Sequence, residues 1–499
     1  MFKPNDVDSL LNSFDLGAST AEKDALLEIA RIETQEFSDL YYYDRIDIVK
    51  GMKGSGKTAL YRLLFFIRDM MIQKQNLYPI FGVEATGDPI FKLYQKEFED
   101  YSEIEFINFW SLYFIVLVYK LIFNAEQLRR QLLDDDIKRI DGLLSNMGLK
   151  IVKSGFDFKE APMSLIDLFR NAKKKVGVET KINPITSLPE SFKPILEIEP
   201  LAREEISKRP LYLTEFKDLI VEILKKNNIR IWIMLDRLDE IFLHRSVTEK
   251  YGLRGLLRAA YNFSDPFLRV KIFLREDILD YLASDGFAAM THIADRCSSA
   301  MSWSKDDILF LITKRLSSIE HVRNFFGFNS ERIDRDKSYR EEIFYRLFPP
   351  KIGKSKTFDW LYSCCSDGND IVTPRDIIDF FKFAKSVQLK NFRSQPEAQE
   401  YLIEEDSFKK ALGILSINKK NNFLFAEFNH LKECFLKFEN SRVEHDNASL
   451  ERILGQDCAK RIEELRSIGF LKYIPKSAVY RIPLIWRKGF NIKQGSSVK

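Results

Sequence analysis

Apolar positions near the start of the chain follow two different periods in succession. Residues 45–50 alternate between polar and apolar side chains, which is typical of a β-strand. From Ala59 onward the apolar residues recur at helical spacing, at Leu60, Leu63, Leu64, Ile67 and Met71. A second strand is predicted over residues 78–84, with Pro79 at its start. Strand, helix and strand at this spacing predict a parallel α/β sheet.

Two further apolar runs extend this sheet. Residues 229–235 are almost continuously apolar, residues 269–274 are predicted as another central strand, and polar residues follow both. Such runs fit strands that are buried on both faces of a parallel sheet. An amphipathic helix is predicted over residues 215–226, directly before the first of these strands, and Thr214 is placed to cap it.

The stretch 101–213 does not follow this alternation, and we predict a helical and hairpin insertion. Residues 109–123 indicate a buried helix, and the apolar run 109–119 is too short to span a bilayer. Residues 127–148 indicate a polar helix or helical pair. Prolines recur over 151–210, where we expect a short hairpin near residues 176–182. The lysine triplet 173–175 is typical of a solvated face, with a nucleic-acid or partner contact as the alternative.

The remaining part of the chain, residues 291–499, is predominantly helical by pattern. Ser304 is placed to cap a helix over 305–316, and Thr373-Pro374-Arg375-Asp376 begins another that continues to Val387. Near the C-terminus we predict helices at 427–438, 449–454 and 457–468, followed by a hairpin over 470–482. Three helices and a hairpin are the order of a winged helix-turn-helix. Its third predicted helix carries a mixed charge, which favours packing or a partner over DNA.

These patterns divide the chain into four parts. We predict a helical leader (1–40), with a helix starting at Ser19 or Thr20, and an α/β core with a parallel sheet (41–290) that contains the insertion at about 101–213. A helical lid (291–400) and a winged-helix-like domain (401–499) follow. The pattern does not decide whether the leader packs across a binding pocket or against the sheet.

Composition gives only weak information about partners, metal sites and cellular compartment. Basic residues number 77 and acidic residues 73, a net charge of +4, which neither favours nor excludes nucleic acid. The five cysteines form no CxxC pair, and the five histidines are scattered, so no zinc-site spacing is present. The first residues do not resemble a signal peptide. We therefore expect a cytoplasmic protein with reduced thiols and no membrane contact.

The strongest candidate chemistry lies between the first strand and its helix. The run Gly51-Met52-Lys53-Gly54-Ser55-Gly56-Lys57-Thr58 matches G-x-x-x-x-G-K-T, the phosphate-binding loop pattern. Glycines allow successive backbone N–H groups to turn around an anion, and the helix dipole adds positive charge there. Lys57 would reach the β- and γ-phosphates of a nucleoside triphosphate, and the Thr58 hydroxyl would hold Mg²⁺.

Polar residues that follow the later strands complete the candidate site. Asp236, Asp239 and Glu240 cluster after the third strand, where a carboxylate can orient Mg²⁺ and its waters and a second can polarise the attacking water. Arg275 ends the next strand and could stabilise charge on the transferred phosphoryl group, with an ion pair to a neighbouring carboxylate as the alternative. Arg375 stands where the helix dipole disfavours a cation, which hints at a ligand; a plain surface arginine is the alternative.

The acidic run Leu235-Asp236-Arg237-Leu238-Asp239-Glu240 resembles the Walker B region of STAND ATPases, particularly of the NACHT type, although Arg237 stands where that type usually has a small residue. A helical lid followed by a winged helix is similar to both STAND proteins and the origin-recognition branch of AAA+ ATPases. With the Lys-Gly-Ser-Gly-Lys-Thr loop and the Pro-Arg-Asp lid element, these features resemble a group of bacterial P-loop ATPases commonly associated with anti-phage defence or DNA-linked systems.

The resemblance implies a role for each matched residue. Lys57 and Thr58 would bind phosphate and Mg²⁺, Asp236 would be the Walker B acid, and Asp239 or Glu240 would activate water. Arg275 would correspond to a sensor-1 residue and Arg375 to a sensor-2 residue. Such ATPases often act as rings or clusters with an arginine supplied by a neighbour, for which the candidates are Arg254, Arg258 and Arg296.

The sequence therefore predicts an Mg²⁺-dependent ATPase that acts as a conformational switch or remodeller. Its expected partners are further copies of the chain and a separate effector protein, because no effector signature lies elsewhere in the chain; nucleic acid stays open as a partner. Two alternatives remain: a nucleotide-gated scaffold with little turnover, and a DNA-engaging ATPase. A GTPase is disfavoured because the guanine-specific motif is missing.

Overall fold

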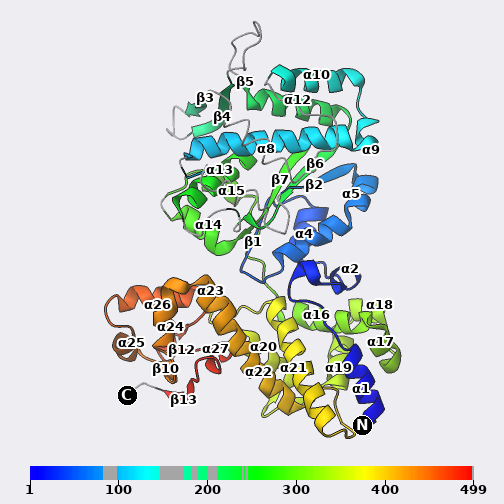
Figure 1. Cartoon of the computed structure of the whole chain (residues 1–499), viewed down its shortest axis with the longest axis vertical. Helices are drawn as coiled ribbons and strands as arrows, with labels where there is room; N and C mark the ends of the chain where they lie inside the picture. Colours follow the sequence, from blue (N-terminus) through cyan, green and yellow to red (C-terminus); the bar gives the residue numbers. More distant parts are fainter. Residues whose placement is uncertain are drawn as a thin grey trace. The chain divides into compact units, whose positions relative to one another are not determined.

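The chain forms two compact units in the computed structural model, which describes residues 1–82, 98–99, 101–146, 174–182, 189–198, 211–238, 241, 246–284 and 286–496 (Figure 1). The first unit consists of Met1–Ile32, Gly54–Gly56 and Ser302–Lys499. The second consists of Glu33–Lys53 and Lys57–Met301. The chain therefore crosses between the units on either side of the tip of the glycine-rich loop.

A parallel four-stranded sheet lies at the centre of the second unit. Its order is β1-β7-β6-β2, and every neighbouring pair is parallel. The strands are β1 (Ile48–Gly51), β2 (Leu77–Phe81), β6 (Arg230–Leu235) and β7 (Leu268–Arg275). The predicted α/β class is confirmed. Of the predicted second strand, residues 83 and 84 lie outside the described part of the chain.

Helices cover both faces of this sheet. On β6, Ile231, Ile233 and Leu235 pack into the larger core with α8 (Glu103–Asn124), α12 (Leu213–Lys226) and α13 (Val247–Phe263). Trp232 and Met234 point to the opposite face, toward α4 (Lys57–Phe66) and α5 (Arg68–Gln75). Burial on both faces explains why the strand is an unbroken apolar run in the sequence.

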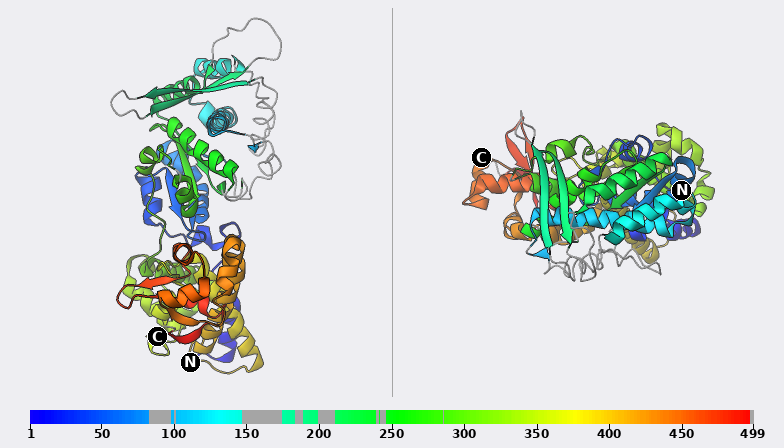
Figure 2. Two further views of the ribbon diagram at one scale, coloured as in Figure 1. Left: turned by 90° about the vertical axis from the view of Figure 1, so that its left-hand side faces the viewer. Right: turned by 90° about the horizontal axis from the view of Figure 1, so that it is seen from above.

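Helix α8 is the long apolar helix of the predicted insertion. It begins at a capping box between Ser102 and Glu105 and lies between the β3–β4 hairpin and α13 (Figure 2). Among the described residues it alone is long and apolar enough to cross a membrane, but 89% of its most apolar window is buried within the fold. The Trp110 indole donates to the Gly252 carbonyl of α13 at 2.9 Å. These contacts are those of a core helix, as predicted.

In the described residues, the rest of the insertion contains a hairpin and the helices α9 (Glu126–Arg129) and α10 (Asp134–Asn146). Strands β3 (Lys174–Ile182) and β4 (Pro189–Ile198) pair antiparallel, and β5 (Leu211–Tyr212) adds to β4. The short hairpin expected near residues 176–182 is instead part of a longer one: these residues lie in a single strand, because they pair with β4 and not with each other. The polar stretch forms α9 and α10. Of the lysine triplet, residue 173 lies outside the described residues.

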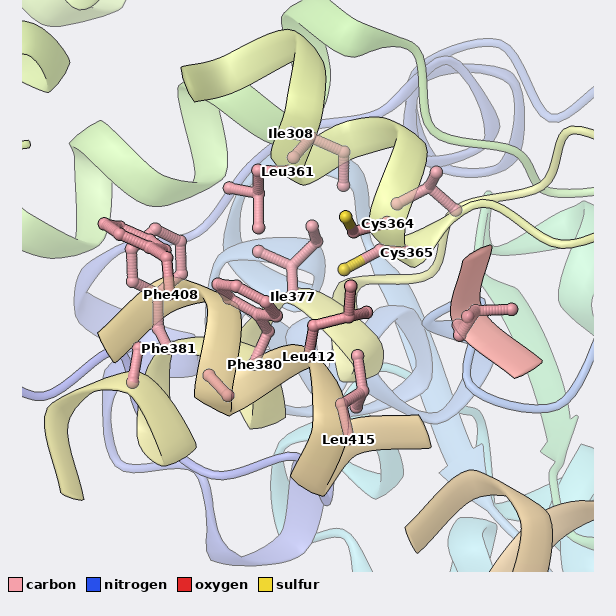
Figure 3. Close-up of a cluster of buried hydrophobic side chains, with 14 of the residues drawn as sticks. Ile308, Leu361, Cys364, Cys365, Ile377, Phe380, Phe381, Phe408, Leu412 and Leu415 are labelled. Atoms are coloured by element: carbon pink, nitrogen blue, oxygen red, sulfur yellow. The ribbon is translucent and has the colours of Figure 1, made fainter. Parts of the chain in front are cut away.

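The first unit is built on a helical core of its own. Its main helices pack around Leu361, Cys364 and Phe380, with Phe408 and Leu415 from a neighbouring helix (Figure 3). These helices are α16 (Lys305–Ser318), α19 (Lys337–Leu347), α20 (Thr357–Cys365), α21 (Pro374–Ser394) and α22 (Glu405–Lys419). The predicted caps Ser304 and Thr373 accept the N3 backbone N–H groups of α16 and α21.

Residues 1–32 of the predicted leader belong to this first unit, whereas residues 33–40 belong to the second. Helix α1 (Pro4–Ser13), which the pattern did not predict, buries Val7, Leu10 and Leu11 in the helical core. The helix expected at Ser19 or Thr20 is reduced to the short turns η1 (Ala21–Lys23) and α2 (Leu26–Ile29). A buried ion pair at 2.6 Å joins Asp24 of this part of the leader to Arg315 of α16, and the Asp24 carboxylate also accepts from the backbone N–H groups of Ala18 and Leu26.

The C-terminal part combines short helices with a small sheet. Helices α25 (Asn447–Leu454) and α26 (Cys458–Ser467) and the hairpin β11 (Lys472–Ile474)–β12 (Val479–Arg481) agree with the pattern. The helix expected over 427–438 is broken into α23 (Phe425–Glu427), η6 (Asn429–Leu431) and α24 (Lys432–Leu436), because Phe428 is non-helical. Strands β10 (Arg442–His445) and β13 (Lys493–Ser496) complete the sheet. The winged-helix assignment stays a prediction.

Candidate nucleotide site

The glycine-rich loop joins β1 directly to α4. Strand β1 ends at Gly51 and α4 begins at Lys57, as the motif requires. Gly54 has φ +87° and Gly56 has φ +106°, conformations that side chains disfavour. The two motif glycines therefore supply the turns that a loop needs to wrap around an anion in front of a helix N-terminus.

The Lys57 side chain is folded back onto the start of this loop. Its ammonium donates to the carbonyls of Gly51 at 2.7 Å and Met52 at 2.9 Å. These bonds hold a full positive charge beside the N-terminus of α4, where the helix dipole also favours an anion. Thr58, the second residue of α4, is half-buried at the same helix end.

The sheet brings the ends of three strands to one edge. Gly51 and Arg275 are direct partners in the β1–β7 register. Strand β7 lies between β1 and β6, and Asp236, only 2% exposed, follows the last residue of β6. Three of the predicted site residues, which are far apart in the sequence, therefore lie along the carboxyl edge of the sheet, where α/β folds bind their ligands.

Arg275 is held by a carboxylate two residues away. Its Nε and one terminal nitrogen donate to the two carboxylate oxygens of Asp277, each at 3.0 Å. The residue is 8% exposed. The ion pair that the sequence offered as the alternative is thus present, and a role toward a phosphoryl group stays a prediction.

The two candidates for water activation, Asp239 and Glu240, lie outside the described residues. Their positions relative to Asp236 therefore stay predictions. Among the residues that the structure does describe, no three His, Cys, Asp or Glu side chains group as a metal centre.

Arg375 lies at the first turn of α21, within the first unit, close to the loop tip that belongs to the same unit. A methyl group added at Gly54 would lie 3.4 Å from the Arg375 Cβ and 3.4 Å from the Thr373 hydroxyl. The Arg375 Nε donates to the Ser19 carbonyl at 3.1 Å. The leader therefore positions this arginine, a contact that the pattern of the sequence did not indicate.

Pattern reasoning also missed Trp303. Its indole N–H donates to the carbonyl of Ser55, in the same unit, at 2.7 Å, across a separation of 248 residues. No motif or spacing marks this tryptophan, because the contact depends on how α16 is placed by the helical core.

The three arginines expected as candidates for a neighbouring site bond within their own chain. Arg254 donates to a backbone carbonyl, Arg258 pairs with a glutamate at 2.8 Å, and Arg296 pairs with an aspartate; the acceptors are Leu282, Glu103 and Asp47. These contacts give each guanidinium a structural role in the second unit.

The parallel sheet, the loop and its helix together define an α/β P-loop fold with helical parts. No family model matches the chain, and no curated protein matches it. Among solved structures, the chain is similar to the ORC2 protein of Aeropyrum pernix, solved as ADPNP and ADP complexes. That likeness has 10% identity and a TM-score of 0.39, and it covers 94% of this chain and 92% of that one.

Two further structures are similar at the same level. One is the Walker-type ATPase PABY2304 of Pyrococcus abyssi, at 9% identity and TM-score 0.38, covering 95% of this chain and 98% of that one. The other is the Aeropyrum pernix ORC1 protein in complex with DNA, at 10% identity and TM-score 0.31, covering 89% and 86%. All three TM-scores are below 0.5, so we draw the function from this chain's own residues.

Proposed function

We propose that this protein is an Mg²⁺-dependent, AAA+-type P-loop ATPase that works as a conformational switch or remodeller. One observation carries the proposal: the Lys57 ammonium is held at the base of a glycine-turned loop, between a parallel strand and a helix N-terminus. Backbone N–H groups of the loop, the Lys57 cation and the helix dipole would together attract an anion there. That arrangement suits the phosphates of a nucleoside triphosphate.

Each residue of the proposed site has a physical task. Lys57 would neutralise phosphate charge. Thr58 and Asp236 supply the hydroxyl and the carboxylate that suit Mg²⁺, which uses one or two protein oxygens together with phosphates and waters. When bound, Mg²⁺ neutralises charge on the phosphates. Asp239 or Glu240 would orient and deprotonate the attacking water.

The two arginines would act at different moments. The position of Arg275, at the strand end beside Gly51, suits a role in stabilising the charge that develops on the transferred phosphoryl group. The position of Arg375, beside Gly54 in the first unit, suits a sensor that would respond to phosphate bound at the loop tip. Since Arg375 belongs to the helical lid, occupancy would then be transmitted to the lid and to the C-terminal part.

A binding and turnover assay of the full chain tests this function. We expect MgADP binding by calorimetry and phosphate release from MgATP, with both lost in Lys57→Ala. Lys74→Ala, which removes an exposed lysine in the last turn of α5, is the matched control and should behave as wild type. Wild-type protein that neither binds nor hydrolyses ATP, alone or with DNA, would refute the proposal.

A nucleotide-gated scaffold with little turnover is the second candidate. The observation that favours it is the commitment of Arg275 to Asp277, which leaves less of the guanidinium for a phosphoryl group. In that case Asp239→Asn and Glu240→Gln should retain nucleotide-dependent assembly in sedimentation experiments, whereas Lys57→Ala should lose it. Loss of assembly in all three variants would favour the hydrolysing switch.

The proposal for partners is wider and rests on the motif resemblance. We propose homo-oligomers and a separate effector in a bacterial anti-phage defence or DNA-linked system. Nucleic acid is a weaker candidate, because α26 presents a charge-balanced face on which Arg461 pairs with Glu464 at 2.8 Å. Measuring DNA binding at low and high salt separates the two cases, since phosphate contacts produce a steep salt dependence.

A further inference from the structure

The carbonyl of Ser55 has a partner from far along the chain. Ser55 is 1% exposed, and its carbonyl accepts a hydrogen bond from the Trp303 indole N–H at 2.7 Å. Both residues belong to the first unit. A buried backbone carbonyl at this position would otherwise lack a compensating bond, so the indole stabilises one orientation of the loop tip.

The geometry of the peptide bond gives this contact a consequence. The peptide unit between Ser55 and Gly56 is planar and trans, so its C=O and its N–H point in opposite directions. Ser55 stands between two glycines with positive φ, Gly54 and Gly56, and glycine allows the flanking peptide planes to rotate at little cost. Whatever fixes the Ser55 carbonyl therefore also fixes the direction of the Gly56 N–H.

We propose that Trp303 is a positioning residue for phosphate binding: by holding the Ser55 carbonyl, it keeps the Gly56 N–H turned toward the phosphate of a bound nucleotide. The inference rests on the proposed nucleotide site and adds a residue that lies outside the motif. Without the indole N–H, the peptide plane would rotate between orientations, and binding would have to select the competent one.

Trp303 is itself held by its surroundings. Its backbone carbonyl accepts from the Tyr362 hydroxyl of α20 at 3.1 Å. The next residue, Ser304, forms the capping box of α16 with Asp307. The indole is therefore carried by a residue that adjoins the capped start of α16 and is bonded to α20, which restrains it as a positioning group requires.

The test compares two phosphate ligands in two variants. Trp303→Phe keeps an aromatic ring and removes the N–H; Trp360→Phe, in α20 and packed on Phe380, is the matched control. We expect Trp303→Phe to weaken both MgADP and Mg-pyrophosphate binding by roughly 5- to 20-fold in calorimetry, the effect of losing about one hydrogen bond. Pyrophosphate isolates the phosphate cradle, because it lacks the base and the sugar.

Each outcome decides the inference. Equal affinities within twofold for wild type and Trp303→Phe would overturn it, as would weaker MgADP binding with unchanged pyrophosphate binding. If Trp303→Phe does not fold by thermal unfolding, the isostere β-(3-benzothienyl)alanine at position 303 preserves the shape and lacks only the N–H, and the same comparison applies. Wild-type protein that binds neither ligand would instead refute the proposed nucleotide site.

Discussion

Lys419 pairs with both carboxylate oxygens of Asp376, at 3.0 and 2.9 Å, and thereby joins the end of α22 to the first turn of α21. The carboxylate is 4% exposed and also accepts from the Thr373 hydroxyl at 2.9 Å. The ammonium lies 4.7 Å from the centre of the Phe423 ring. This pair sits one residue beyond Arg375, so it fixes the helix turn that carries the proposed sensor.

Breaking this pair should destabilise the first unit. We expect Lys419→Met to lower the free energy of unfolding by about 3 kcal/mol, because it leaves a buried carboxylate without its cation. The double variant Asp376→Asn with Lys419→Met should recover part of this loss, because it leaves no unpaired charge buried at this position. Urea unfolding measures both. Lys409→Met, which removes an exposed pair with Glu405 on the same helix, should cost less than about 1 kcal/mol.

The contact of α13 with α8 leaves no room for a side chain at Gly255. A methyl group there would lie 2.6 Å from the Phe106 Cβ and 3.0 Å from the Ile107 backbone nitrogen. Gly255→Ala should therefore destabilise the second unit by about 1–3 kcal/mol. Gly142→Ala on α10 meets nothing within 4 Å and should be neutral or stabilising by up to about 1 kcal/mol. A lower melting temperature for Gly142→Ala than for Gly255→Ala would contradict this packing.

Stability should depend on pH through Asp367. Burial raises the pKa of this carboxyl from its ordinary 3.8 to about 6, although the backbone N–H groups of Ile371 and Asn369 donate to it and lower it. The folded chain therefore holds the proton more tightly than the unfolded chain. The stabilisation is complete below pH 3.8 and is lost as the pH rises through 6, at most roughly 3 kcal/mol.

Asp367→Asn removes this dependence while it keeps an acceptor for both backbone N–H groups. We expect its melting temperature to match wild type near pH 4 and to exceed wild type increasingly between pH 5 and 7. Parallel melting curves of the two proteins across this range would show instead that the carboxyl does not change its proton affinity on folding.

Substitutions in the Arg275–Asp277 pair should distinguish the hydrolysing switch from the scaffold with little turnover. If Arg275 stabilises the transferred phosphoryl group, Arg275→Ala should lower kcat for ATP hydrolysis by roughly 100-fold and change MgATP affinity little. Asp277→Asn retains the arginine but weakens its bidentate hold, so we expect a smaller decrease in kcat. Steady-state phosphate release measures both. Unchanged kcat in Arg275→Ala would make the pair purely structural.

Local patterns predicted the central part of the fold well. The strand predicted over 45–50 lies at Ile48–Gly51, and the helix predicted from Ala59 begins at Lys57; both elements were expected because a phosphate loop constrains its own neighbours in sequence. The edge arrangement of Gly51, Arg275 and Asp236 was also foreseeable, since parallel strands end at one edge. The cap at Thr373 followed from a short motif in the same way.

Contacts between distant segments could not be predicted from such patterns. The Trp303–Ser55 bond spans 248 residues, and the Arg375–Ser19 bond spans 356. Neither has a spacing or a composition of its own, because each depends on the packing of whole helices. For the same reason α1 escaped prediction: its apolar face becomes informative only when its partners are known.

The packing of residues 1–32 in the first unit has a consequence for folding during synthesis. Val7, Leu10 and Leu11 leave the ribosome before the second unit, yet they pack into a core whose buried residues outside the leader start at Ile308. The sheet can fold during synthesis, whereas α1 must wait for about 300 more residues, roughly 15–60 s at usual elongation rates. An apolar helix that waits so long is a natural client for a chaperone bound to the nascent chain.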